Sequence, residues 1–546
     1  MNSLNGSINQ NGNNNKNSWE KKTSGNKEPS WYSNIEQPIK FAKLTNNIPS
    51  SSGGEPVDVV IIGGGIAGLT TAYMVSKSGK KVVVIEDGYV GSGETGRTTA
   101  HITHALDDRY YNLEKRHGLN GARIAASSHT AAINHIELIV REENIDCDFQ
   151  RLDGFLFLDP SDKKETLDRE LEATHRVGIN ATEIIERVPL QSFGTGPCIR
   201  FPNQAQFQPL KYLRGLSQAI IKNGGQIYTE THAQEVSSDG IITVNDYLVK
   251  AKNIVIATNA PIVDKTSKIY DKQDAYRTYV IGARIKKGAI PTALYWDTGD
   301  QNSGNLVAPY HYVRIQIIYD DNKNYDLLIV GGEDHQTGNL SSDNDIEKRY
   351  SRLESWAKDH FPIEGIEYQW SGQVMEPKDS IAFIGHNPGD GRNNIYIATG
   401  DSGNGITHGT IAGILLTDLI LGKSNPWAAL YDPSREPGQE LGSDAREGVQ
   451  HRKEENQIKS SPKSEEELSL ESLVEGQGVV SEDKKIAAYK DYRGQLHTFS
   501  AVCTHLGCIV TWNNLEKSFD CPCHGSRFSS AGNVINGPAN TALENK

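Results

Sequence analysis

The chain has 546 residues and a formal net charge of −13, with 36% hydrophobic and 23% charged residues. Its length predicts about three to four domains, and its negative charge argues against nucleic acid or an anionic membrane surface as a partner. No apolar run reaches the length of a membrane span, and the amino-terminal stretch has no apolar signal region, so a cytoplasmic protein is expected.

The first ordered pattern along the chain begins at residue 57. Residues 1–30 are rich in Asn, Ser and Lys, which is typical of a disordered tail. Residues 57–63 form a continuous apolar run, 67–79 have helical periodicity, and 81–87 form a second apolar run. This order predicts a βαβ unit whose strands are buried on both faces.

Three glycines lie where the first strand meets the helix. Gly63, Gly65 and Gly68 spell G-x-G-x-x-G, and Glu86 ends the second strand. In a dinucleotide site the first glycine makes the turn, the second admits the pyrophosphate, and the third packs helix on strand. The diphosphate then lies at the helix amino terminus, and the acidic residue accepts hydrogen bonds from a ribose.

A second G-x-G-x-x-G occupies residues 91–96, after the acidic residue and without a strand of its own. One interpretation is a flexible glycine loop. The favoured interpretation is a second loop that contacts the cofactor through backbone amides and through Thr95, Thr98 and Thr99.

The middle of the chain mixes helices and strands. Helices are predicted at 122–145 and 161–178, and strands of a larger sheet at 279–285, 311–319 and 325–332. Buried strands return at 253–258 and 393–399, and a glycine-rich helix start follows the second of them at 405. A helix amino terminus there can stabilise negative charge on a bound cofactor.

Four stretches carry a family resemblance: 63–73, 93–103, 375–385 and 399–410. They resemble the FAD-dependent amine and amino-acid oxidoreductases of the D-amino-acid oxidase group. The resemblance implies an α/β fold in which a Rossmann-like FAD-binding domain (about 57–105, 205–262 and 371–425) is interleaved with an α+β substrate domain (about 106–204 and 263–370), within a region spanning 31–431. Motif and resemblance together assign the following residues to FAD: Gly63, Gly65, Ile66, Ala67, Gly68, Glu86, Thr95, Gly96, Thr98, Thr99, Ala100, Val236, Ala257, Thr258, Gly400, Gly403, Asn404, Gly405, Ile406 and Thr407.

The composition changes after residue 431. Residues 432–467 are charged and nearly free of large apolar side chains, which predicts a flexible linker. Residues 468–546 regain strand patterns and predict a small all-β domain. This domain holds four of the six cysteines, and their clustering with histidine indicates metal binding.

Two short motifs supply the ligands. Cys503 and His505 form C-x-H, and Cys521 and His524 form C-x-x-H. Two thiolates and two imidazoles suit a zinc ion, and they equally suit a [2Fe–2S] cluster with one histidine-held iron. The neighbouring Pro522, Gly525, Ser526 and the stretch 536–539 resemble the Rieske family and favour the cluster.

The Rieske resemblance has further implications. The extra cysteines, Cys508 and Cys523, match a pair that forms a disulfide between the two cluster loops in the high-potential proteins of cytochrome bc complexes. Ser526 matches a serine that bonds a bridging sulfide. Phe528 replaces a tyrosine that donates another hydrogen bond, so a lower potential is expected.

Together the two ends predict a fused FAD–Rieske oxidoreductase acting on C–N bonds. A small amine or amino-acid-like substrate would deliver a hydride to FAD, and the cluster would pass electrons singly to an unidentified external acceptor. The linker would let the small domain dock on the flavin and then on its partner. No catalytic side chain is assigned; His101, Tyr310, His335 and Trp370 are candidates for the substrate face, and His101 and His104 leave covalent FAD attachment open.

Three other functions are conceivable for a chain with these motifs. An NAD(P)H-driven reductase or monooxygenase component should show a second strand–GxGxxG–helix unit, and none appears in the sequence. A non-catalytic redox sensor should lack substrate turnover. A Rieske oxygenase would need a separate site of two histidines and a carboxylate. Its nearest match, 101–108, falls within the flavin-like loop, which argues against an oxygenase.

Overall fold

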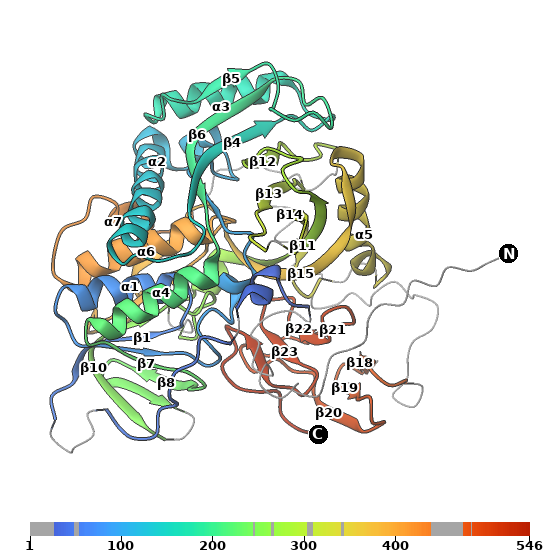
Figure 1. The fold of residues 1–546 in the computed structure, drawn as a ribbon. Helices are drawn as coiled ribbons and strands as arrows, with labels where there is room; N and C mark the ends of the chain where they lie inside the picture. Colours follow the sequence, from blue (N-terminus) through green and yellow to red (C-terminus); the bar gives the residue numbers. More distant parts are fainter. Residues whose placement is uncertain are drawn as a thin grey trace.

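Two large sheets and a small C-terminal β domain make up the computed structural model of the protein (Figure 1). The structure describes residues 27–35, 37–48, 54–243, 246–263, 267–302, 309–320, 322–339, 343–437, 473–481 and 483–546. The predicted tail up to residue 26 and the predicted linker from residue 438 lie outside the described residues. Among the described helices, none has the length and apolar character needed to cross a bilayer.

The first sheet is built on the predicted βαβ unit. β1 (Val57–Ile62) and β2 (Val82–Ile85) pair in parallel, and β10 (Leu248–Ile256) lies on the other side of β1. The strand order is β16-β17-β10-β1-β2-β7, with the β8–β9 hairpin attached to β10. The remaining strands are β7 (Gln226–Tyr228), β8 (Ala233–Ser237), β9 (Gly240–Thr243), β16 (Phe383–His386) and β17 (Ile395–Thr399).

Helices pack on this sheet because its apolar strands are buried on both faces. α1 (Ile66–Lys77) contacts both α4 (Pro209–Lys222) and α6 (Gly405–Ile420), and the three lie together above the first sheet in Figure 1. α2 (Tyr110–Glu142) packs on α6 and begins earlier than predicted, because its first turns continue across a non-helical Gly118. α7 is a short helix at Ala428–Tyr431.

The second sheet is mostly antiparallel, with the order β15-β11-β14-β13-β12-β4-β6-β3 and β5 paired to β6. Its long central strands are β11 (Gln273–Lys286), β14 (Tyr325–Gln336) and β15 (Ile363–Pro377), which α5 (Asp343–His360) covers. The others are β3 (His101–Ile102), β4 (Gln150–Phe157), β5 (Glu183–Ile185), β6 (Cys198–Gln206), β12 (Leu294–Asp297) and β13 (Tyr312–Gln316); α3 (Lys164–Arg176) lies beside β5 and β6. The α/β fold class with an interleaved second domain is confirmed.

The C-terminal β domain (residues 473–546) is drawn in red in Figure 1 and lies against both sheets. One sheet has β18 (Gly478–Val480), β19 (Ile486–Lys490) and β20 (Leu496–Ser500). The other has β21 (Thr511–Asn513), β22 (Ser518–Asp520), β23 (Arg527–Ser529) and β24 (Val534–Asn536). The ligand motifs lie in the loops after β20 and β22.

Both ends of the oxidoreductase region are packed where the structure describes them. A short 3-10 helix (Ser30–Asn34) buries Trp31, and the Ser30 hydroxyl donates to Gln316, although residues up to 30 were predicted to be a disordered tail. The first residues of the predicted linker are also fixed, because Arg435 binds both carboxylate oxygens of Asp379 at 2.8 and 2.9 Å.

Candidate flavin and iron–sulfur sites

A cavity of about 300 Å³ lies where the first sheet, the second sheet and the C-terminal β domain meet. Ligand sites of this volume, lined by apolar residues and a few polar groups, are typical of cofactor binding. This space, called the central cavity below, begins at the carboxyl end of β1.

The glycine turn after β1 leaves no room for side chains. Gly63 has φ +113°, and a Cβ on it would lie 2.3 Å from the carbonyl oxygen of Ala257 in the neighbouring strand. A Cβ on Gly68 would lie 2.0 Å from the carbonyl oxygen of Gly63. The first glycine therefore makes the turn and the third lets α1 pack on it, as the dinucleotide-binding motif requires.

Glu86 faces this turn from the end of β2. Its carboxylate accepts hydrogen bonds from the backbone amides of Gly64 at 2.6 Å and Gly88 at 2.7 Å. Burial raises the pKa of Glu86 to about 7, although these two amides act in the opposite direction. The carboxylate thus stands beside the turn, where a ribose hydroxyl of a dinucleotide is held.

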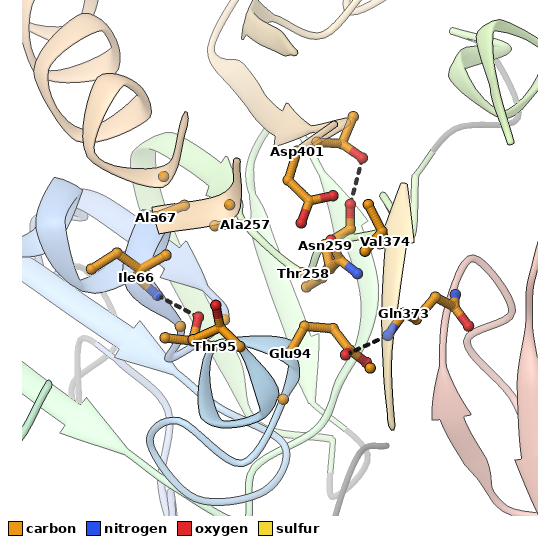
Figure 2. A pocket seen from close by; sticks show the side chains of 18 of the residues that line it. Ile66, Ala67, Glu94, Thr95, Ala257, Thr258, Asn259, Gln373, Val374 and Asp401 are labelled. Carbon is orange, nitrogen blue, oxygen red and sulfur yellow. Dashed lines mark hydrogen bonds between the residues drawn. The ribbon is translucent and has the colours of Figure 1, made fainter. Parts of the chain in front are cut away.

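The second glycine-rich loop folds as a short 3-10 helix, Glu94–Arg97. The Thr95 hydroxyl accepts from the amide of Ile66 at the amino end of α1, at 3.0 Å (Figure 2). Thr98 and Thr99 also line the central cavity. This loop therefore lies at the edge of the central cavity, and its contact with the cofactor stays a prediction.

The strand ends complete the cradle. Ala257 and Thr258 follow β10, and Gly403 to Ile406 lead from β17 into α6. Of the residues assigned to FAD from the sequence, the following line the cavity: Gly63, Gly65, Ile66, Ala67, Glu86, Thr95, Thr98, Thr99, Ala257, Thr258, Gly403, Asn404, Gly405 and Ile406. Six lie outside its lining: Gly68, Gly96, Ala100, Val236, Gly400 and Thr407.

The position of Val236 differs most from the expectation. It lies in β8 and packs against the core beneath the first sheet, whereas the residues just before it, Thr231 to Ala233, line the cavity. Ala233 and Val236 belong to the same strand and pack on the same core cluster, but only Ala233, at the start of β8, reaches the cavity.

The part of the cavity formed by the second sheet carries buried carboxyl groups. Tyr310 donates to Asp107 at 2.7 Å, and Asp334 lies nearby on β14. Burial raises the pKa of Asp107 to about 6 and that of Asp334 to about 6. Glu376 on β15 also has its pKa raised by burial and by the neighbouring Asp108. This side of the cavity is therefore suited to a positively charged ligand.

The structure separates the four candidates for the substrate face. His101 and Tyr310 line the cavity, whereas His335 stacks on Tyr279 and Trp370 is buried with its ring N–H donating to the carbonyl of Arg97. The His101 ring nitrogens meet the Thr99 hydroxyl at 3.0 Å and the carbonyl of Val313 at 3.3 Å.

Burial lowers the pKa of His101 to about 3, so this ring is neutral. His104, the other histidine considered for covalent attachment, lies outside the cavity lining. Its ring contacts Gln204 at 2.9 Å and Thr130 at 3.2 Å.

The metal ligand motifs converge in the C-terminal β domain. Cys503 and Cys521 are buried and their thiols hydrogen-bond to each other. The rings of His505 and His524 lie 5.1 Å apart, edge to face. Two thiols and two imidazoles on facing loops fit a [2Fe–2S] cluster with one cysteine-held and one histidine-held iron.

The flanking residues hold these loops together. Cys508 and Cys523 form a disulfide, as the Rieske resemblance implies. The Ser526 hydroxyl bonds to Cys503 and accepts from the amide of Ala539 at 2.9 Å. Phe528 is fully buried in the domain core, so the position lacks a hydroxyl that could donate to the cluster.

The C-terminal β domain is docked through a buried polar interface. Arg277 of β11 binds Glu516 at 3.0 Å, with both side chains almost fully buried. The Ser371 hydroxyl of β15 donates to the same carboxylate at 2.6 Å. Gln373, which lies beside the pale red ribbon of this domain in Figure 2, donates to the carbonyl of Gly525 at 3.0 Å.

The two histidines of the ligand motifs face the oxidoreductase region. Tyr270, in a 3-10 helix at Ile269–Lys272, packs its ring 5.1 Å from that of His505 and 4.7 Å from that of His524. The edge of the cluster site that the imidazoles form is therefore covered by the segment that connects β10 to β11.

A nucleotide-binding α/β fold joined to a cysteine- and histidine-rich β domain defines a flavoprotein with an iron–sulfur centre. The family model for FAD dependent oxidoreductases matches residues 58–419, and the model for the Rieske [2Fe-2S] domain matches residues 466–545. The chain belongs to the FAD dependent oxidoreductase family and carries a Rieske domain at its C-terminus. Its cofactors are FAD and a [2Fe–2S] cluster.

Three known proteins are similar to this chain in sequence or in structure. YhfW of Bacillus subtilis (strain 168), named as a Rieske 2Fe-2S iron-sulfur protein, is 32% identical over 516 residues, covering 92% of this chain and 96% of its own. Gamma-glutamylputrescine oxidoreductase of Escherichia coli (strain K12) is 25% identical over 383 residues, covering 68% and 85%. The crystal structure of L-proline dehydrogenase from P. horikoshii has a TM-score of 0.54 at 22% identity, covering 70% and 98%, and shows the same fold.

Sequence reasoning missed two sets of cavity residues. The carboxyl groups of Asp107, Asp334 and Asp401 were not assigned, and Glu376 was noticed only as part of a flavin-like segment. The second set belongs to the Rieske domain, from Val534 to Asn540, and lines the central cavity from across the domain boundary. The sequence of 536–539 predicted a Rieske cluster but did not predict a contact with the cavity.

Proposed function

We propose that this protein is an FAD-dependent dehydrogenase that oxidises a small amine and passes the electrons singly through its Rieske cluster to an external one-electron acceptor. The observation that carries the proposal is the shared cavity, in which Rieske residues and the dinucleotide motif line one space. When bound, FAD accepts two electrons at a time and the cluster transfers one at a time. Two single-electron transfers through the cluster therefore remove the two electrons that FAD takes up in one substrate oxidation.

The charges around the cavity support a substrate whose reacting end carries an amine and no carboxylate beside it. Asp107, Asp334 and Glu376 lie on the second-sheet side, and burial raises their pKa values. A bound cation would lower these pKa values again, because it stabilises the ionised carboxylates. Among the described residues that line the cavity, Arg97 is the one side chain of the Lys and Arg type. Its guanidinium already donates to the carbonyls of Ser371 at 2.5 Å and Lys27 at 2.7 Å.

These side chains have separate tasks in the proposed reaction. Asp334 and Asp107 hold the ammonium group, and Tyr310 fixes the Asp107 carboxylate through its 2.7 Å hydrogen bond. Neutral His101 and the ring of Trp296, which lie 5.6 Å apart, form an aromatic wall that keeps water from the reacting carbon. The name of the E. coli relative, gamma-glutamylputrescine oxidoreductase, supports an amine substrate.

The experiment is an anaerobic titration of the purified protein with a monoamine, a diamine, glycine and NADH in parallel. Loss of flavin absorbance reports substrate oxidation, and the EPR signal of the reduced Rieske cluster reports onward transfer. An amine is expected to change both signals, whereas glycine and NADH leave them unchanged. Reduction by NADH alone, or by glycine in preference to every amine, contradicts the proposal.

A matched pair of cysteine variants separates the two steps. Cys503→Ser removes a cluster ligand, so the amine should still bleach the flavin without producing the EPR signal. Cys198→Ser alters another buried cysteine, in β6, and should behave as the wild type does. If the Cys503→Ser protein shows the full EPR signal, Cys503 does not hold the cluster.

A further inference from the structure

We propose that the Rieske segment Val534–Asn540 is part of the FAD-binding site and retains FAD by closing the central cavity over the adenosine end of the cofactor. This role concerns cofactor retention, so it does not depend on which substrate the enzyme oxidises. The residues of this segment that line the cavity are Val534, Ile535, Asn536, Gly537, Ala539 and Asn540.

Asn540 ties the segment to the dinucleotide-binding domain. Its side-chain amide donates to the carbonyls of Ala233 and Gln234, at 2.9 Å each. Its own carbonyl accepts from the ring of His232 at 3.1 Å. Three hydrogen bonds therefore fix this one residue across the domain boundary.

The residues that Asn540 contacts lie at the nucleotide end of the cavity. The amide of Thr231 donates to the carbonyl of Glu86 at 3.0 Å, and the His232 ring lies 3.4 Å from the carboxylate of Asp87. Since Glu86 is the acidic residue at the end of the second strand of the βαβ unit, this region receives the adenosine half of a dinucleotide. Asn540 thus closes the cavity beside the ribose position.

The other end of the segment is also anchored. The Asn536 side chain donates to Glu94 at 3.0 Å, in the loop that covers the amino end of α1. Gly537 approaches the strand end after β10 so closely that a Cβ on it would lie 3.2 Å from the carbonyl oxygen of Ala260. The segment therefore spans the cavity between two fixed edges, and FAD release requires these contacts to open.

The first test compares two asparagine variants. Asn540→Ala removes the two side-chain hydrogen bonds, whereas Asn533→Ala alters an exposed asparagine just before β24 that does not line the cavity. FAD is titrated into FAD-stripped protein and its binding is followed by flavin fluorescence. We expect the dissociation constant to rise about ten-fold for Asn540→Ala and to stay within about two-fold of wild type for Asn533→Ala.

The Rieske EPR spectrum of dithionite-reduced protein serves as the folding control, because the cluster is formed within the same domain. Weaker FAD binding with an unchanged spectrum supports the proposal. Equal FAD affinity in Asn540→Ala, Asn533→Ala and wild type overturns it, whatever the amine oxidation rates are.

The second test needs no substitution and holds if Asn540→Ala does not fold. Hydrogen–deuterium exchange is measured on the wild type with and without FAD. FAD should slow amide exchange in 534–540 at least about five-fold and leave the strands β19 and β20 unchanged, because slower exchange reports suppressed local opening. Equal exchange of 534–540 in both forms contradicts the proposal.

Discussion

Arg277 and Glu516 form a buried ion pair at 3.0 Å that joins the second sheet to the Rieske domain. Arg527 of the Rieske domain lies 3.8 Å from the same carboxylate. Burial is the largest single effect and opposes the ionised carboxylate, but the guanidinium groups of Arg277, Arg527 and Arg97 together outweigh it and lower the pKa of Glu516 to about 2. The domain interface thus depends on one carboxylate shared by charges from both sides.

Replacing Glu516 with Ala should destabilise the docked protein by about 3–5 kcal/mol, because Arg277 is left buried without its counter-charge. Urea unfolding followed by tryptophan fluorescence measures the change. Glu475→Ala, at an exposed Rieske position, is the control and should change stability by less than about 0.5 kcal/mol. Equal stability of the two variants would show that the ion pair does not support the interface.

The same carboxylate predicts sensitivity to acid. Because the folded-state pKa of Glu516 lies below its usual value of 4.5, its contribution to stability is fully present above pH 4.5 and is lost as the pH falls toward 2. Midpoint temperatures measured from pH 6 to pH 3 should fall less steeply for Glu516→Gln than for wild type. Parallel curves for the two proteins would contradict this assignment.

Tyr270 packs against His505 and His524, the two histidines proposed to hold the cluster, so its ring should control how solvent and small reductants reach the cluster. Tyr270→Ala is expected to speed cluster reduction by dithionite several-fold, whereas Tyr270→Phe keeps the ring and should resemble wild type. Stopped-flow absorbance measures the rate, and EPR checks that the cluster is intact. Tyr492→Ala, at an exposed Rieske tyrosine, is the matched control. If Tyr270→Ala and Tyr492→Ala are reduced equally fast, the ring does not shield the ligands.

The carboxyl groups of the cavity predict how activity depends on pH. Asp107 and Asp334, each with a pKa near 6 raised by burial, become protonated as the pH falls through 6 and then lose their attraction for an ammonium group. The kcat/KM for a cationic amine should therefore decrease below pH 6. Asp334→Asn should raise KM at neutral pH about ten-fold, as expected for a lost charge-assisted hydrogen bond.

Asp334→Asn should also stabilise the free protein, which separates a charge effect from damage to the fold. A raised folded-state pKa means that ionised Asp334 costs stability above its pKa, so the variant should melt at a higher temperature at pH 8 than wild type. A lower melting temperature together with an unchanged KM would contradict the role of this carboxylate.

The disulfide Cys508–Cys523 should protect the cluster by holding the two ligand loops together. In Cys508→Ser, the EPR signal of the reduced cluster should decay faster on incubation at raised temperature, while FAD binding stays as in wild type. Cys147→Ser, at a buried cysteine outside the Rieske domain, is the control. Equal decay in both variants would show that the disulfide adds nothing to cluster retention.

Much of the site could be predicted because it is encoded by short contiguous motifs. The spacing of Gly63 and Gly68 is required by a turn that leaves no room for side chains. The spacing within the two short motifs that begin at Cys503 and Cys521 is required to bring two thiols and two imidazoles around two irons. The carboxyl group of Asp334 could not be found in this way, because it reaches the cavity from a strand more than 200 residues after Asp107. Pairing of β11 with β14 and β15 brings Asp334 and Glu376 to that side.

The placement of Asn540 illustrates a second limit. Its stretch matches a pattern that explains cluster binding, and nothing in that pattern indicates a contact with Ala233 some 300 residues earlier. Such contacts arise from the fit of two domain surfaces, which is set by shape and by buried pairs such as Arg277 and Glu516. These are properties of the folded domains and have no local sequence signature.

The covered histidine edge has a consequence for kinetics. Because Tyr270 and the Rieske ligands belong to one chain and touch, the encounter between the two redox centres is unimolecular, with an effective concentration set by the fold. Diluting the enzyme leaves this internal encounter unchanged. In the proposed function, the collision with the external acceptor would be the step that follows second-order kinetics, so the flux would respond to the abundance of that acceptor. The fusion also means that the two cofactor-binding domains are always produced in equal amounts.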